Sequence, residues 1–128
     1  MHGDRRRKHF DEVLDQIIAE LPEDLRELLE QVPLIVEDEP SRELTDQLGI
    51  DTRISQLCGL HSGVPLTERS VHHAYRLPDR MMLFRGPIER LAHHHCDSLI
   101  QQVRKTLLHE IGHHFGLDED DLARLGYG

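Results

Sequence analysis

The chain contains no tryptophan and few other aromatic residues, which make up 4% of its 128 residues. Long hydrophobic runs are missing too, and none approaches the roughly 20 apolar residues that a membrane-spanning helix requires. The core must therefore be small and aliphatic, and we expect no membrane partner. We interpret residues 1–128 as a single domain, which is long enough for a modest core without disulfide bonds.

Cysteine is scarce as well. The two cysteines, Cys58 and Cys96, lie far apart and show none of the C-x-x-C spacing of zinc ribbons or redox motifs. We interpret both as reduced, small core residues of a cytoplasmic protein.

An excess of positive charge is also lacking, because 15 Lys and Arg stand against 24 Asp and Glu, for a net charge of −9. Such a chain has no general attraction for nucleic acid phosphates or anionic lipids. One basic run, Arg5 to Lys8, is followed at once by acidic residues and not by the apolar segment of a signal peptide. We therefore expect a solvated helix start there and no nucleic acid partner.

Helical and strand periodicities alternate along the chain. They predict helices over 10–21, 25–32 and 41–48, a strand at Leu34–Val36, strands over 70–77 and in RMMLFR at 80–85, and a long helix from Asp97 or Ser98 to Phe115. The two later strands are expected to form a hairpin with its turn at Pro78 and Asp79, and Gly86 and Pro87 are expected to end the second strand. The segment GLHSGVPLTER, residues 59–69, predicts a turn-rich connection, and the histidines at 93–95 predict a polar loop.

Histidine is abundant, with 11 residues, and its most informative cluster is HEIGHHFGLDE at 109–119. His109 and His113 are four residues apart, so on a helix they project from one face. The apolar stripe that contains Leu107 and Ile111 lies about 160° round the helix from His109. This side can pack on a sheet while both imidazoles face a cleft. His114 is expected to serve in packing or in support of a ligand.

These residue types are the ones that a catalytic zinc site uses, because zinc there takes three protein ligands and leaves one position for water. Glu110, next to the first histidine, is the candidate general base. Gly116 permits a left-handed helix end, after which Glu119 could supply the third ligand; Asp118 and Asp120 remain alternatives. A shuffled chain of this composition would contain the full pattern only about 0.001 times.

The chain resembles the minimal zincin family of small bacterial zinc-metallopeptidase-like proteins. Five segments carry the resemblance in the same order: FDEVLDQIIAELP, VPLIVEDEP, GLHSGVPLTER, LPDRMMLFRGPIER and HEIGHHFGLDEDDLARLG. The resemblance implies an α+β, zincin-like fold with a few helices packed on a small mixed β-sheet and the zinc-binding helix near the C-terminus. It also implies Zn²⁺ as the cofactor.

Three departures from related patterns bear on function. The family usually carries Asp where this chain has Glu119, and Gly-Leu-Tyr-Glu-Gly where this chain has GLHSG at 59–63. The methionine turn of metzincins is not expected after Gly116. Tyr127 is the nearest candidate for an oxyanion stabiliser, although a residue near a chain end is more often frayed.

We expect a zinc-dependent metallopeptidase-like hydrolase in which metal-activated water attacks a peptide bond and Glu110 is the general base. The substrate would be a peptide or protein lying along RMMLFR as an edge strand. One alternative is a zinc-stabilised binding or regulatory module with little catalysis. Another is a metal-dependent RNA hydrolase, which the negative charge disfavours.

Overall fold

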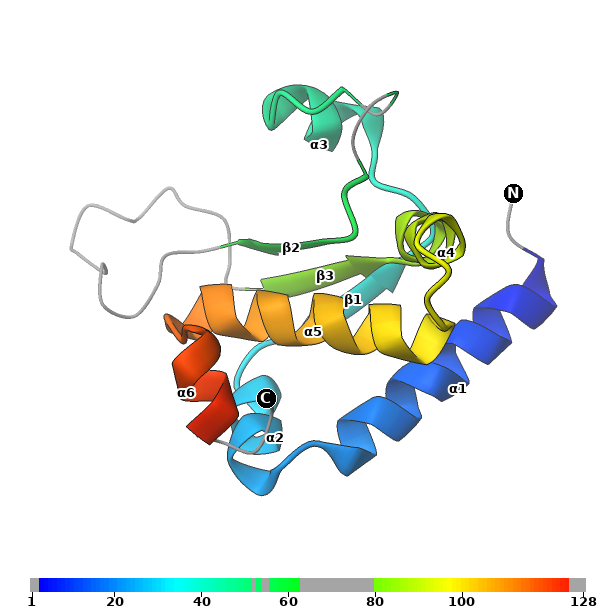
Figure 1. Ribbon diagram of the computed structural model, residues 1–128. Helices are drawn as coiled ribbons and strands as arrows, with labels where there is room; N and C mark the ends of the chain where they lie inside the picture. Colours follow the sequence, from blue (N-terminus) through cyan, green and yellow to red (C-terminus); the bar gives the residue numbers. More distant parts are fainter. Residues whose placement is uncertain (1–2, 52, 54–55, 63–79, 125–128) are drawn as a thin grey trace.

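The protein is represented by a computed structural model that describes residues 3–51, 53, 56–62 and 80–124 (Figure 1). In chain order the elements are α1 (Asp4–Glu20), α2 (Glu23–Glu30), β1 (Leu34–Glu37), α3 (Arg42–Gln47), β2 (Gly59–Ser62), β3 (Arg80–Phe84), α4 (Arg85–His94), α5 (Leu99–Phe115) and α6 (Glu119–Arg124). They form an α+β fold with helices on a small mixed sheet, as the sequence and its resemblance predicted.

The sheet has the strand order β1-β3-β2, with β1 parallel and β2 antiparallel to the central strand β3. The prediction that RMMLFR forms an edge strand is therefore wrong: it is β3, and β2 is at the edge. Residues 59–62 were predicted as part of a turn-rich connection and instead form β2. Glycine and polar residues usually indicate a turn. In β2 they occur because the strand lies at the sheet edge and packs closely on a helix. The predicted strand over 70–77, and the hairpin that depends on it, lie outside the described residues.

Helix α5 is the longest element near the C-terminal end and is closed by a defined cap at each terminus. Ser98 accepts a hydrogen bond from the backbone N–H of Gln101, whose side chain accepts one from the Ser98 N–H, so the two residues form a capping box. Gly116 ends the helix with φ 70° and ψ 32°, a left-handed conformation that glycine adopts without strain. Both ends agree with the sequence-based prediction.

The hydrophobic core lies between the sheet and helices α1, α2 and α5 (Figure 1). Val103, Leu107 and Ile111 of α5 are fully buried, which confirms the predicted stripe on that helix. The remaining buried members of the core are Phe10, Val13, Leu14, Ile17, Leu21, Leu25, Leu29, Val32, Met81, Leu83 and Ile88. Within the part of the chain that the structure describes, no helix combines the length and apolarity needed to cross a bilayer.

Strand β3 ends at Phe84, just before Gly86 and Pro87, where its end was predicted, and continues directly into α4, a helix that was not predicted. Proline fits the first turn of a helix, where its missing N–H would have no intrahelical partner. His93 and His94 form the last turn of α4 instead of a polar loop, and His95 is its C-cap. Cys96 follows in an exposed position with φ 55°, which contradicts its predicted place in the core.

An ion-pair network joins α1 to the ends of β1 and β3. Arg85, whose side chain is 12% exposed, contacts Asp11 at 2.9 Å and Asp38 at 3.1 Å. Arg7, from the basic run at the start of α1, contacts the same Asp38 at 2.7 Å. The basic run thus begins a helix, as predicted, and one of its members ties that helix to the sheet.

Candidate functional site

The polar face of α5 carries the candidate metal ligands. The imidazole rings of His109 and His113 lie one turn apart with their centroids 4.2 Å from each other, and both residues are exposed. Glu110, between them in sequence, is only 7% exposed. The helix therefore places two imidazoles side by side at the surface and a carboxylate in the adjoining buried position, as the spacing predicted.

Strand β2 packs closely on α5 at Glu110. A Cβ atom added to Gly59 would lie 2.9 Å from the Cγ of Glu110, 3.2 Å from its Cδ and 3.1 Å from the backbone oxygen of Met82. No side chain fits in this space, so glycine is required for the strand to approach the carboxylate at this distance. The role of Gly59 is not evident from the sequence alone, because a glycine in a polar stretch is typical of a turn.

The outer edge of β2 pairs with no other strand among the residues that the structure describes. The carbonyl of Cys58 accepts a hydrogen bond from the N–H of Phe84 on β3, and antiparallel strands alternate between residues that bond to the neighbour and residues that point away. The main-chain N–H and C=O groups of Gly59 and His61 therefore point away from β3. No other described residue pairs with these groups.

A groove of about 410 Å³ lies between this strand, α4 and the polar face of α5. Its lining consists of Gln56, Leu57, Cys58, Gly59, Leu91, Gln102, Lys105, Thr106, His109 and Glu110. Gln102, Thr106 and His109 follow one another at helical spacing, so one stripe of α5 forms a wall of the groove. In the sequence these residues form a polar stripe opposite the apolar one, and only the histidines of that stripe were predicted as site residues.

Cys58 lines the groove beside Glu110. Burial raises the pKa of its thiol to about 11, Arg90 opposes the rise, and the negative charge of Glu110 adds to it. At neutral pH the side chain is therefore a thiol, which is a poor metal ligand and a poor nucleophile. The structure places this cysteine partly in the core, as predicted, and also at the wall of the candidate site.

The turn after α5 brings the chain back along the helix. A Cβ atom on Gly112 would lie 2.9 Å from the carbonyl oxygen of Leu117, and the Leu117 N–H donates to the Gly112 carbonyl at 2.7 Å. The absence of a side chain at Gly112 thus makes room for this turn, and not for the sheet. This local packing determines where α6 begins.

Two of the four acidic residues after Gly116 are engaged in capping α6. The Asp118 carboxylate accepts a hydrogen bond from the Asp121 N–H at 2.8 Å, and the Asp121 carboxylate accepts one from the Asp118 N–H at 3.0 Å. This reciprocal pair is a capping box built from aspartates. Glu119 is the first residue of α6, and its side chain lies outside the described part of the structure.

The residues present fit part of a zinc site. Because a zinc–nitrogen bond is about 2.0–2.1 Å long, two imidazoles can share one ion only when their rings lie next to each other, as those of His109 and His113 do. Among the side chains that the structure describes, no group of three His, Cys, Asp or Glu residues could hold a metal ion. The third ligand expected from sequence, Glu119, is not among those side chains.

The other candidates have different positions. His114 is 6% exposed and packs edge-on against Phe115 with ring centroids 4.8 Å apart, which confirms its predicted packing role. Tyr127, the candidate oxyanion stabiliser, lies outside the described residues.

A comparison with curated proteins finds no match. A comparison with protein families matches residues 29–128 to zincin-like metallopeptidases. This match includes the sheet, the groove and the whole of α5, and it begins within α2, after the whole of α1. The chain belongs to the zincin-like metallopeptidase family.

Proposed function

We propose that the chain is a zinc-dependent peptide hydrolase in which His109, His113 and Glu119 hold the metal and Glu110 is the general base. One observation carries the proposal: a buried carboxylate lies beside two adjacent exposed imidazoles and faces a groove bounded by β2, the outer strand of the described sheet. Zinc in such a site would polarise the peptide carbonyl and lower the pKa of a water molecule.

Glu110 performs the proton transfers in this scheme. Its carboxylate accepts a proton from the attacking water and returns it to the nitrogen of the departing amine. Burial against Gly59 limits the positions that this carboxylate can adopt, so it is held in place before substrate binds.

The edge of β2 would hold the substrate. The outward main-chain groups of Gly59 and His61 can pair with an extended peptide, which adds a fourth strand to the sheet. Main-chain pairing of this kind is independent of side-chain identity, so it positions the peptide and leaves specificity to the groove.

The test is a cleavage screen with a degenerate peptide library, in which wild type is compared with Glu110→Gln and zinc content is measured for both. We expect both proteins to contain zinc and cleavage to fall at least a thousandfold in the variant, since water then lacks its base. Glu89→Gln, an acid on α4 that does not line the groove, is the control and should retain activity. Cleavage that survives Glu110→Gln would overturn the mechanism, and zinc binding without any cleavage by wild type would favour a binding or regulatory module.

A further inference from the structure

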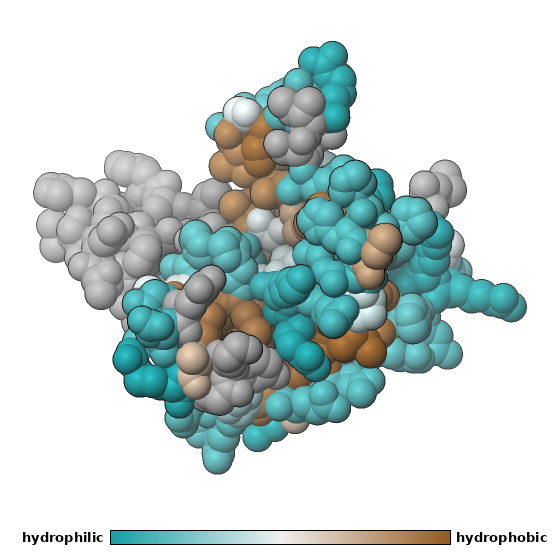
Figure 2. Space-filling view, viewed as in Figure 1, coloured by the Kyte–Doolittle hydropathy of each residue, from teal (hydrophilic) through white to brown (hydrophobic). Residues whose placement is uncertain are grey.

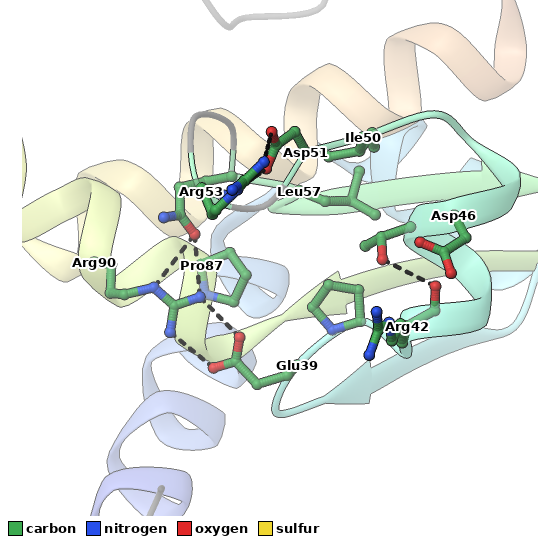
Figure 3. Close-up of a pocket in the computed structure, with 12 residues that line it drawn as sticks. Glu39, Arg42, Asp46, Ile50, Asp51, Arg53, Leu57, Pro87 and Arg90 are labelled. Carbon is green, nitrogen blue, oxygen red and sulfur yellow. Dashed lines mark hydrogen bonds and ion pairs between the residues drawn. The ribbon is translucent and has the colours of Figure 1, made fainter.

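A second and larger cavity adjoins the groove. It measures about 790 Å³, lies between α3 and the start of α4, and shares Gln56 and Leu57 with the groove that contains His109 and Glu110 (Figure 3). Because the same two residues line both, the cavity and the groove are neighbours along the segment that leads into β2.

The lining of this cavity combines apolar residues with charged and polar ones. The apolar members are Pro40, Ile50, Leu57 and Pro87, and Figure 3 shows Leu57 pointing into the cavity with Ile50 beside it. The space-filling view shows hydrophobic surface below α3, on the side toward the sheet (Figure 2). Exposed apolar surface inside a cavity favours an apolar ligand group.

The charges in the lining compensate one another. Arg90 binds the Glu39 carboxylate at 2.7 and 2.8 Å and also donates to the Gln56 side-chain oxygen at 3.1 Å. Arg53 binds Asp51 at 3.0 Å. On α3, Arg42 and Asp46 are one turn apart and add one charge of each sign. A charged ligand group would therefore gain little net attraction here.

The distance between Glu110 and the cavity determines which residue of a bound peptide could reach the cavity. Leu57 and Gln56 precede Gly59 by two and three residues, so they lie at most about 7 and 10 Å along the chain from the strand position that faces Glu110. An extended peptide bound along the same segment covers this distance in two to four of its own residues.

We propose that this cavity is a specificity pocket for a large aliphatic or aromatic side chain, placed two to four residues from the peptide bond that is cleaved. The inference rests on the proposed function for its reaction, and on the two residues shared by cavity and groove for its location. Arg90 holds the junction between pocket and groove, because it fixes Gln56 to Glu39 at the end of β1.

The experiment compares Ile50→Asp with Leu48→Asp. Ile50 lines the larger cavity, which we call the distal pocket, and does not line the groove. Leu48, two residues away in the same segment, is 45% exposed and does not line the distal pocket. Ten-residue degenerate peptides are digested and the cleavage sites are read by mass spectrometry. Wild type and Leu48→Asp should prefer Leu or Phe at one position two to four residues from the cleaved bond. In Ile50→Asp the preference, and kcat/KM for such peptides, should fall about tenfold or more. Ile50→Ala is a milder second variant, which should lower the preference and kcat/KM in the same direction.

Binding is measured separately in the Glu110→Gln background, with fluorescein-labelled pools rich in Leu or rich in Ser. We expect the Leu-rich pool to bind more tightly, and Ile50→Asp but not Leu48→Asp to remove the difference. If wild type cleaves nothing yet this difference is seen, the peptidase proposal fails and the pocket stands. Equal binding of the two pools, or equal effects of Ile50→Asp and Leu48→Asp, would overturn the pocket.

Discussion

Gly59 is the residue that allows an edge strand and a buried catalytic candidate to occupy adjoining positions. Its main chain continues β2, while the missing side chain leaves space for the carboxylate of Glu110. We predict that Gly59→Ala lowers peptide cleavage by about 100-fold, because a methyl group there displaces the carboxylate or the strand by a fraction of an ångström to an ångström. Zinc content should not change. Gly3→Ala, where the added methyl group meets no atom within 4 Å, is the control. Full activity in Gly59→Ala would show that Glu110 does not need its observed position.

The acids after Gly116 have separable roles at the level of single residues. Asp118 is committed to capping α6, so Asp118→Ala is predicted to lower the free energy of unfolding by about 1 kcal/mol while zinc affinity changes little. Glu119→Ala is predicted to weaken zinc binding by at least 100-fold, and Glu119→Asp to retain it. Calorimetric zinc titration of the three variants measures these differences. Zinc loss in Asp118→Ala alone would transfer the third-ligand role to that residue.

Between elements, the contact that responds most directly to pH is the network of α1, β1 and α4. The pKa of Asp38 is lowered below its ordinary 3.8, first by hydrogen bonds from Arg7, against the opposing effect of burial, and further by Arg85. A carboxylate with a depressed folded-state pKa stabilises the fold at pH values above its unfolded pKa. This contribution is lost as the pH falls through the folded pKa.

We therefore predict that Asp38→Asn lowers the free energy of unfolding at pH 7 by up to about 1 kcal/mol, and that its difference from wild type shrinks as the pH falls below 3.8 and through the lowered folded-state pKa. Urea unfolding at a series of pH values provides the measurement. Asp51→Asn, which removes a pair only two residues apart on the surface, should have a much smaller effect. A difference that persists unchanged at low pH would mean that Asp38 acts through its shape and not through its charge.

At the scale of the whole molecule, the core and the candidate metal site lie on opposite faces of α5. Val103, Leu107 and Ile111 are buried against the other core residues, while His109 and His113 are exposed on the polar side. The core should therefore survive metal removal, although zinc that binds only the folded state still adds to its stability.

We predict that chelation lowers the melting temperature reversibly by about 10 °C without loss of helical circular dichroism at 25 °C. Melting curves before chelation, after it and after zinc is restored measure this. Global unfolding at 25 °C on chelation would show that the apolar core is insufficient by itself.

Local patterns were sufficient to predict α1, α2, α3 and α5 and the two strands with continuous apolar runs, but not α4, whose residues were predicted as a strand end and a polar loop. The caps Ser41, Ser98 and Gly116 are local signals, and each occurs in the structure where the sequence indicates it. Strand β2 was not predictable in this way, because its residues are stabilised by pairing with β3 and by contact with α5, both distant in sequence. The edge position was assigned to the wrong strand for the same reason.

The site was predictable to the extent that it lies on one helix. His109 and His113 share a face because of their four-residue spacing alone, and the structure places their rings side by side, with Glu110 in the adjoining buried position. Gly59, Cys58 and Leu57 come from another part of the chain, and only tertiary packing brings them to the groove. The distal pocket depends on α3 and α4, whose relative placement no local pattern encodes.

The central claim is that α5 provides two imidazole ligands to zinc at this groove, and X-ray absorption at the zinc edge of the purified protein tests it most directly. We predict one zinc per chain with a first shell of nitrogen and oxygen at about 2.0–2.1 Å, two imidazoles among them, and no sulfur. His113→Ala should lose the metal, and His93→Ala, an exposed histidine on α4, should retain it. A sulfur neighbour at about 2.3 Å, which Cys58 could provide, or zinc retained in His113→Ala, would contradict the account.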